Sequence, residues 1–126
     1  MPITEILTQN AKLYPDETAL VEITPVNEDK IRMSWKEFPL TPSNPGHTGR
    51  REITWRGFNK RANRFGHLLQ QRGYKKGDKI AVLLMNSLEW LPAYFGILKA
   101  GCIVVPLNYR YTADEILYCL KKADCT

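Results

Sequence analysis

The chain has 126 residues, a length that suits one domain. Hydrophobic residues make up 44% of the sequence and charged residues 25%, which are ordinary values for a globular protein, so disorder is not the default expectation. The net charge of +5 favours anionic partners such as nucleic acid, anionic lipid or a phosphate-rich cofactor. A solvated basic surface explains a surplus of this size better than specific nucleic-acid binding does.

The cysteines and histidines indicate neither a disulfide framework nor a metal site. Cys102, Cys119 and Cys125 are odd in number and contain no C-x-x-C pair, which favours a reducing compartment. His47 and His67 do not stand at ligand spacing from a cysteine.

Nothing in the sequence predicts secretion or a membrane span. Residues 1–14 carry Glu5 and no apolar core run, unlike a signal peptide. The longest apolar stretches, 80–85 and 102–107, are too short to cross a bilayer. We therefore expect a soluble, cytoplasmic protein.

The first predicted elements are a helix and a strand. Helical spacing predicts a helix over 3–14, ended by Pro15, with one apolar face made of Ile3, Ile6, Leu7, Ala11 and Tyr14. A short strand is predicted over 18–24, where Val21 and Ile23 alternate with polar neighbours.

Residues 25–50 are the least organised part and are interpreted as an insertion or loop excursion. Alternation at 31–35 suggests a short strand, and 39–49 is dense in turn-forming residues. An interdomain linker would have a similar composition. However, Trp35 and Phe38 are costly to leave in water, which favours an excursion that folds back on the body.

The next element is an amphipathic helix that Thr54 caps and that runs to about Arg72. Gly73 is placed to end it in a left-handed conformation, and Gly57 stands where a capping acid would help. The predicted core stripe consists of Trp55, Phe58, Ala62, Phe65, Leu68 and Leu69. Basic residues fall largely on the other side, at Arg56, Lys60, Arg61 and Arg64.

Two apolar runs, 79–85 and 102–106, predict buried strands. Between them a helix is predicted from a cap at Asn86-Ser87 to about Lys99, with Pro92 in its first turns and Gly101 ending it. Its inner face is predicted to contain Leu88, Leu91, Phe95 and Leu98.

A last helix follows Thr112, which forms a Thr-x-x-Glu capping box with Glu115. Its inward residues are predicted to be Ile116, Leu117, Cys119 and Leu120. The order strand–helix–strand–helix with short links predicts an α/β fold, a parallel βαβα unit preceded by a helix and short strands. A further strand is expected to begin at 124–126, which would leave an open sheet edge.

Three segments carry a resemblance to a known family. Residues 53–65, with Asn59, Ala62 and Asn63, followed by Leu68, resemble the first core motif of the adenylate-forming superfamily. Residues 73–78 resemble the turn into its first buried strand, and 97–110 resemble its second core motif. The Pro-Leu-Asn-x-Arg ending (Pro106, Leu107, Asn108, Arg110) is similar to the acyl-CoA synthetase branch. The sequence departs from the family pattern at Gly57 and Cys102.

The resemblance implies that residues 1–126 are part of the N-terminal, AMP-binding type domain of an AMP-forming acyl-CoA synthetase. Such an enzyme joins a carboxylate to coenzyme A through an acyl-adenylate, using ATP and magnesium. The partner expected to cover the open sheet edge is the remainder of the synthetase or an oligomer partner.

The family's phosphate-binding loop and catalytic lysine have no counterpart here, and the resemblance implies that they lie downstream. Pro45–Gly49 is the nearest approach to a phosphate loop, but no Lys-Ser/Thr follows it. We therefore assign no catalytic, cofactor-binding or metal-binding residue, expect no cofactor to bind this segment alone, and expect it to be inactive by itself.

Other constellations have structural interpretations that are preferred. Arg50, Arg51 and the basic helix face with Trp55 and Phe58 could bind nucleic acid. The preferred interpretation is that both aromatic residues fall on the core stripe and that the basic residues, Arg51 included, solvate the opposite face. The remaining candidates are Asp114 and Glu115 as an acid–base pair, residues 109–111 (Tyr-Arg-Tyr) as a pocket wall, and Cys119 as a nucleophile. Two other classes of function stay open, a non-catalytic interaction module of the same fold and a small basic nucleic-acid-binding protein.

Overall fold

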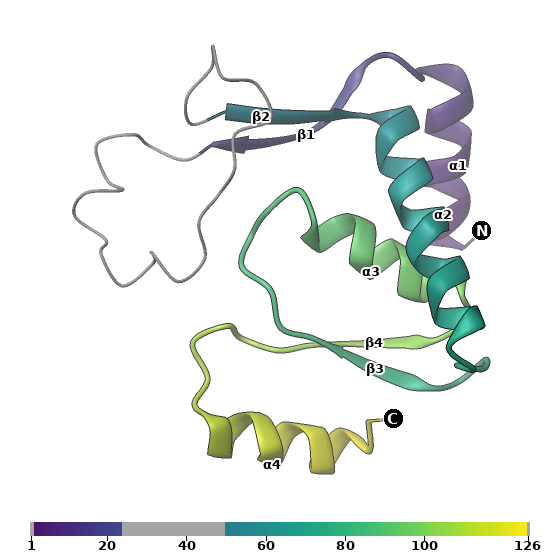
Figure 1. Ribbon diagram of the computed structural model, residues 1–126. Helices are drawn as coiled ribbons and strands as arrows, with labels where there is room; N and C mark the ends of the chain where they lie inside the picture. Colours follow the sequence, from purple (N-terminus) through teal and green to yellow (C-terminus); the bar gives the residue numbers. More distant parts are fainter. Residues whose placement is uncertain (1, 24–49, 126) are drawn as a thin grey trace.

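The computed structural model describes residues 2–23 and 50–125, which form mixed helices and strands (Figure 1). The predicted strand at 31–35 and the turn-rich segment 39–49 lie outside these residues. In chain order the elements are α1 (Ile3–Leu13), β1 (Thr18–Ile23), β2 (Arg50–Thr54), α2 (Trp55–Gln71), β3 (Lys79–Val82), α3 (Trp90–Lys99), β4 (Ile103–Pro106) and α4 (Ala113–Ala123).

The central prediction, a parallel pair of strands, is confirmed. β3 and β4 run in parallel, with Lys79 opposite Ile103 and Val82 opposite Pro106. Helix α3 connects them and lies on one side of the pair, while α4 lies on the other side (Figure 1). The first strand is shorter than the predicted 79–85, because the ladder stops at Val82 and the chain then turns toward α3.

The N-terminal strands differ from the prediction in two ways. Residues 50–54 form β2, antiparallel to β1, whereas the sequence predicted only the approach to a helix there. In β1 the buried side chain is Glu22, with 8% of its surface exposed, whereas Val21 and Ile23 are 44% and 68% exposed. Val21 and Ile23 therefore do not form a buried apolar face, because Glu22 points inward and forms an ion pair with Arg51 there.

Helix α1 forms as predicted, but its apolar face is narrower. Leu7 is buried, whereas Ile3, Ile6 and Tyr14 are about half exposed. The helix therefore contacts the body along a thin line of side chains and leaves apolar surface uncovered among the described residues.

Helix α2 begins and ends where the sequence predicts. The side chain of Thr54 accepts a hydrogen bond from the backbone N–H of Gly57, and Gly73 follows the helix with a positive φ of 91°. Phe58, Ala62 and Leu69 of the predicted stripe are buried. Leu68 is 42% exposed, so its assignment to the stripe is wrong.

Helix α3 begins at Trp90, later than the predicted cap at Asn86-Ser87. Leu88 is buried in the turn before the helix, where its backbone N–H donates to the carboxylate of Glu22. Pro92 then falls in the first turn, where a missing N–H costs no helical hydrogen bond.

The last helix, α4, has the predicted capping box between Thr112 and Glu115. None of its described side chains is buried, and Leu117 is 50% exposed, so its assignment to the inner face is wrong. An amphipathic helix normally packs its apolar face against other elements, and the described residues cover only part of that face of α4.

The core is divided into two clusters. One joins α1, β2 and α2 to the start of α3 and contains Leu7, Ile53, Phe58, Ala62 and Leu88. The other lies between α2, α3 and the parallel strands and contains Leu69, Val82, Ile97 and Cys102. Helices α2 and α3 belong to both clusters, so their contact holds the two halves together.

Candidate functional site

The carboxyl ends of β3 and β4 are the place where open α/β sheets bind ligands. The backbone N–H of Leu107 donates to the carbonyl of Val82 at 2.8 Å, which continues the pairing one residue beyond β4. Asn108 shapes the next turn, because its side-chain oxygen accepts from the N–H of Arg110 and its carbonyl accepts from the N–H of Tyr111, both at 3.0 Å.

The candidate pocket residues Tyr109, Arg110 and Tyr111 are brought together at this turn. The Nε atom of Arg110 donates to the hydroxyl of Tyr109 at 3.0 Å, and its guanidinium carbon lies 5.5 Å from the centre of the same ring. All three residues are exposed. The turn therefore presents a cation and two aromatic rings to solvent, a surface able to attract an anionic group.

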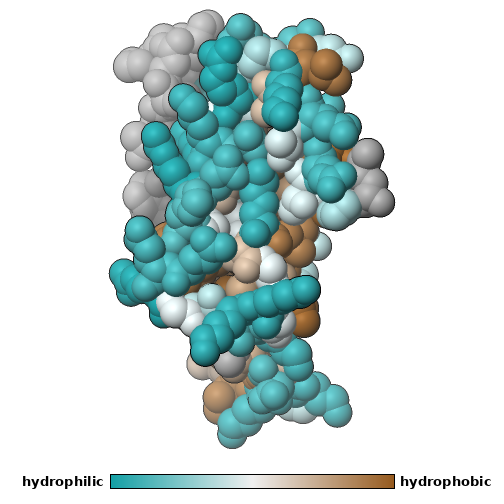
Figure 2. Space-filling model, turned by 90° about the vertical axis from the view of Figure 1, so that its right-hand side faces the viewer, coloured by the Kyte–Doolittle hydropathy of each residue, from teal (hydrophilic) through white to brown (hydrophobic). Residues whose placement is uncertain are grey.

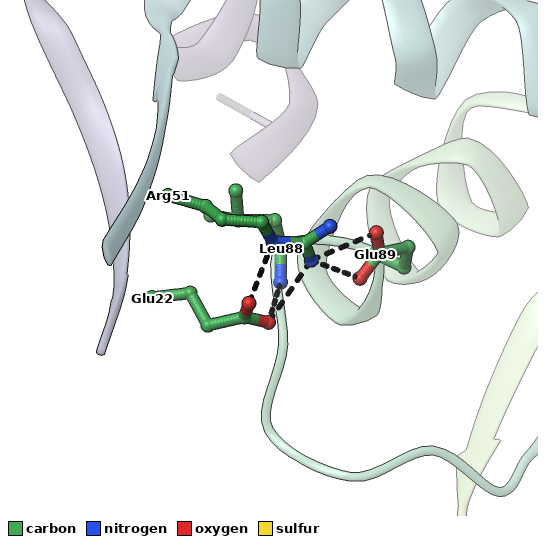
Figure 3. A network of polar contacts seen from close by, with 4 residues as sticks. All are labelled: Glu22, Arg51, Leu88 and Glu89. Atoms are coloured by element: carbon green, nitrogen blue, oxygen red, sulfur yellow. Dashed lines mark hydrogen bonds and ion pairs between the residues drawn. The ribbon is translucent and has the colours of Figure 1, made fainter. Parts of the chain in front are cut away.

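A partly buried ion-pair network fixes the segment that follows β3 (Figure 3). Arg51 donates to both oxygens of Glu22, at 2.6 and 3.1 Å, and to both oxygens of Glu89 at 3.0 Å. Glu22 also accepts from the backbone N–H of Leu88 at 3.1 Å. The network therefore ties the β1–β2 hairpin to the turn that leads into α3.

Both carboxylates of this network face the one guanidinium group of Arg51. The hydrogen bond to Glu22 raises the pKa of Arg51. Burial opposes ionisation of Glu89, but hydrogen bonds from Arg51, the backbone and Ser87 outweigh it and hold the pKa of Glu89 below its ordinary value. Both carboxylates are committed to Arg51, which suits a structural role better than proton transfer. The sequence prediction that Arg51 belongs to a solvated basic face is wrong.

A second polar cluster explains the two asparagines of the first core motif. The ammonium group of Lys99 donates to the side-chain oxygens of Asn59 at 2.7 Å and Asn63 at 2.8 Å, and to Thr8 at 3.3 Å. Burial lowers the pKa of Lys99. Sequence spacing placed both asparagines on one helix face, but only the fold shows that Lys99 of α3 bonds to both.

The alanine of the same motif is where α2 and α3 make their closest approach. Ala62 is fully buried, and a methyl group added at Gly96 would lie 2.8 Å from its carbonyl oxygen. Gly66 meets the carbonyl of Gly96 in the same way, at 3.1 Å. The motif residues therefore pack and connect two helices, and none of these contacts requires a ligand.

The other sequence candidates also have structural partners. Glu115 exchanges hydrogen bonds with Thr112 in the capping box, and Asp114 lies in the same exposed first turn. Phe58 is buried against Trp55 and Phe95, which confirms its place in the core. Cys119 is half-buried on α4. Pro45–Gly49 and His47 lie outside the described residues.

Within residues 2–23 and 50–125 no group of His, Cys, Asp and Glu side chains could hold a metal ion. No helix of the described segments combines the length and apolar character needed to cross a bilayer. Cys102, the departure from the family pattern, is buried beside β4, and burial together with the nearby charge of Asp78 raises the pKa of its thiol.

Comparison with known sequences identifies relatives among CoA ligases. One, from Mycolicibacterium smegmatis, is named medium/long-chain-fatty-acid–CoA/3-oxocholest-4-en-26-oate–CoA ligase and is 38% identical over 77 residues. Another, the 3-hydroxybenzoate–CoA/4-hydroxybenzoate–CoA ligase of Thauera aromatica, is 36% identical over 75 residues. The matches cover 61% and 60% of this chain, and each spans only 14% of the relative.

A solved structure has the same arrangement of elements. The N-terminal domain of FACL13 from Mycobacterium tuberculosis superposes with a TM-score of 0.71 at 26% identity, covering 99% of this chain and 26% of that domain. The model of the family described as AMP-binding enzyme matches residues 7–126. The family match over nearly the whole chain and the shared fold show that this protein belongs to the AMP-binding enzyme family.

Proposed function

We propose that this chain is part of the N-terminal domain of an ATP-dependent carboxylate–CoA ligase, and that residues 2–125 supply framework rather than chemistry. The observation that carries the proposal is the family match over residues 7–126. The site geometry agrees with it, since the motif residues Asn59, Ala62 and Asn63 all hold α2 against α3.

The proposed reaction has two steps. An oxygen of the substrate carboxylate attacks the α-phosphate of ATP and forms a mixed anhydride, the acyl-adenylate, while pyrophosphate leaves. The thiol of coenzyme A then attacks the acyl carbon, loses its proton, and AMP leaves. The adenylate is needed because a free carboxylate has no good leaving group, so one difficult step becomes two easier ones.

We assign none of the described residues to ATP or magnesium binding. They contain no cluster of side chains that could hold a metal ion, and the turn after β4 presents one exposed cation, Arg110. We infer that the phosphate-binding loop, the magnesium ligands and the catalytic lysine belong to other parts of the enzyme. The proposed role of this segment is structural: it positions the carboxyl ends of β3 and β4 beside the groups that bind ATP and magnesium.

The remainder of the synthetase is the proposed partner of this segment. Leu83 and Leu84 directly after β3 and Ile103 of β4 are 39–48% exposed, and Leu117 and Tyr118 of α4 are 50% and 66% exposed. Apolar surface of this kind beside a two-stranded sheet calls for further strands and helices. Residues 25–50 are proposed to be an excursion from the β1–β2 hairpin.

The substrate acid is proposed to be chosen elsewhere in the enzyme. Two relatives whose names specify fatty or steroid acids and hydroxybenzoates match this segment at 38% and 36% identity. Such similar identities to enzymes of different named substrates support the view that this segment does not select the acid. A cytoplasmic location is also proposed, on the support of three free cysteine thiols.

A pyrophosphate-release assay tests the proposal. The purified 126-residue chain, supplied with ATP, magnesium, coenzyme A and a mixture of fatty and aromatic acids, is expected to show no turnover. A longer polypeptide that continues this chain into a Ser/Thr/Gly-rich loop with a lysine is expected to release pyrophosphate with the same mixture. Turnover by the short chain would refute the framework role, and an inactive longer polypeptide would refute the ligase assignment.

A further inference from the structure

The outward side of α2 and its C-cap carry a cluster of cations. Lys60, Arg61, Arg64 and Arg72 are exposed, and the exposed Leu68 lies among them at helical spacing. These five residues are called the basic face of α2. Figure 2 looks onto the side of the molecule that carries α1 and α2, and hydrophilic side chains cover much of it.

Within residues 2–23 and 50–125, no acidic group pairs with the basic face of α2. Helix α2 contains no Asp or Glu. None of the four cations forms an ion pair with a residue at 2–23 or 50–125, whereas the neighbouring Arg56 pairs with Asp16 at 3.1 Å. The charge of the basic face therefore remains available to an external anion.

The stability of α2 does not explain these cations. Lys60 and Arg64 stand four residues apart, where like charges destabilise a helix and where an acid would stabilise it. Lys60, Arg61 and Arg64 also lie before the last turn of α2, and only Arg72, at the C-cap, stands where the helix dipole favours a cation. A function outside the fold accounts for the pattern better than packing does.

The composition of the face indicates which anionic partner it fits. Stacking on bases needs exposed aromatic rings, but Phe58 is buried and Trp55 packs beside it on the opposite side of α2. What the face offers instead is a cluster of long cationic side chains around one exposed leucine, and clustered cations of this kind are attracted to anionic lipid headgroups. We propose that the basic face of α2 adsorbs the protein to anionic phospholipid headgroups at a membrane surface. This inference is independent of the proposed ligase activity.

Vesicle sedimentation of the purified protein tests the inference. Binding to vesicles of phosphatidylserine and phosphatidylcholine is expected, with none to pure phosphatidylcholine, and added salt should weaken it because the Debye length falls from about 10 Å at 0.1 M to about 3 Å at 1 M. Each cation near such a surface strengthens binding about fivefold, so the variant K60Q/R61Q/R64Q should bind about 100-fold more weakly.

A second triple variant controls for net charge. K12Q/K121Q/K122Q removes the same number of charges from exposed positions on α1 and α4 and is expected to bind like the unaltered protein. Circular dichroism and thermal melting of both variants verify folding. Equal loss in both variants would show that net charge alone attracts the protein and would overturn the proposal. Tighter binding of the basic face to duplex DNA than to vesicles, at equal phosphate concentration, would overturn it in favour of nucleic acid.

Discussion

At the scale of single residues, the Asn-x-x-Ala-Asn pattern has a physical explanation in the contact between two helices. Asn59 and Asn63 share the ammonium group of Lys99, and Ala62 allows the backbone of Gly96 to approach. The ammonium group of Lys99 donates hydrogen bonds to three neutral oxygens, those of Thr8, Asn59 and Asn63. Burial lowers its pKa, and these hydrogen bonds replace those that it would make to water, with no carboxylate in the cluster.

Replacing Gly96 with alanine is expected to destabilise the protein. The new methyl group would lie 2.8 Å from the carbonyl oxygen of Ala62 and 2.9 Å from two side-chain atoms of Phe65, and neither helix backbone can yield without moving the core. Overpacking of this kind costs about 1–3 kcal/mol, which outweighs the better helix propensity of alanine. Urea denaturation followed by tryptophan fluorescence measures the change.

Gly57→Ala is the matched control for this substitution. Its methyl group would meet one γ-carbon of Ile53 at 3.0 Å and no backbone atom, and alanine has the better helix propensity, so a smaller change, within about 1 kcal/mol, is expected. Equal stability of the Gly96 variant and the unaltered protein would contradict the close helix contact described here.

At the scale of elements, the β1–β2 hairpin is attached to the rest of the fold through a carboxylate. Glu22 lies near the end of β1, between Val21 and Ile23, which face outward. Its partner Arg51 is the residue opposite it in the antiparallel ladder. Because Arg51 also reaches Glu89 and Glu22 also reaches the N–H of Leu88, the hairpin and the start of α3 are fixed relative to one another.

Glu22→Gln is expected to lower the free energy of unfolding by about 2–3 kcal/mol. The neutral amide would leave Arg51, whose side chain is 15% exposed, with Glu89 as its carboxylate partner and would lose a charge-assisted bond to Leu88. Chemical denaturation at neutral pH measures the loss.

The control is Glu52→Gln on the neighbouring strand position. Glu52 pairs with Arg50 at the surface, where both side chains are about half exposed, so a change of at most about 1 kcal/mol is expected. If both substitutions cost the same, the Glu22 network would have no more effect than a surface ion pair.

At the scale of the whole molecule, the described helices differ in how much of their side-chain surface is buried. Both core clusters include α2 or α3, whereas α4 buries none of its side chains. Parallel strands are ordinarily covered on both faces and flanked by further strands. The exposed Leu117 and Tyr118 are consistent with a helix whose neighbours belong to another part of the enzyme.

Hydrogen exchange is expected to reflect this difference. In the 126-residue chain, the amides of α4 should exchange at least about 100-fold faster than those in the buried part of α2, because opening α4 exposes little apolar surface. Mass spectrometry of peptides from each helix measures the rates, and a longer polypeptide should protect α4. Protection of α4 equal to that of α2 in the short chain would contradict this account.

The sequence by itself determined the features that depend on residues close together in the chain. The Thr54 cap, the left-handed Gly73, the Thr112–Glu115 capping box and the strand–helix–strand order are all local, and local propensity fixes them.

Only the tertiary structure decided the pairings between distant residues. Glu22 meets Leu88 across 66 positions and Lys99 meets Thr8 across 91, so no spacing rule could have paired them. The inward turn of Glu22 and the late start of α3 follow from these pairings, since a buried carboxylate must find its donors wherever the fold supplies them. The burial of α4 depends in the same way on contacts that the described part of this chain does not contain.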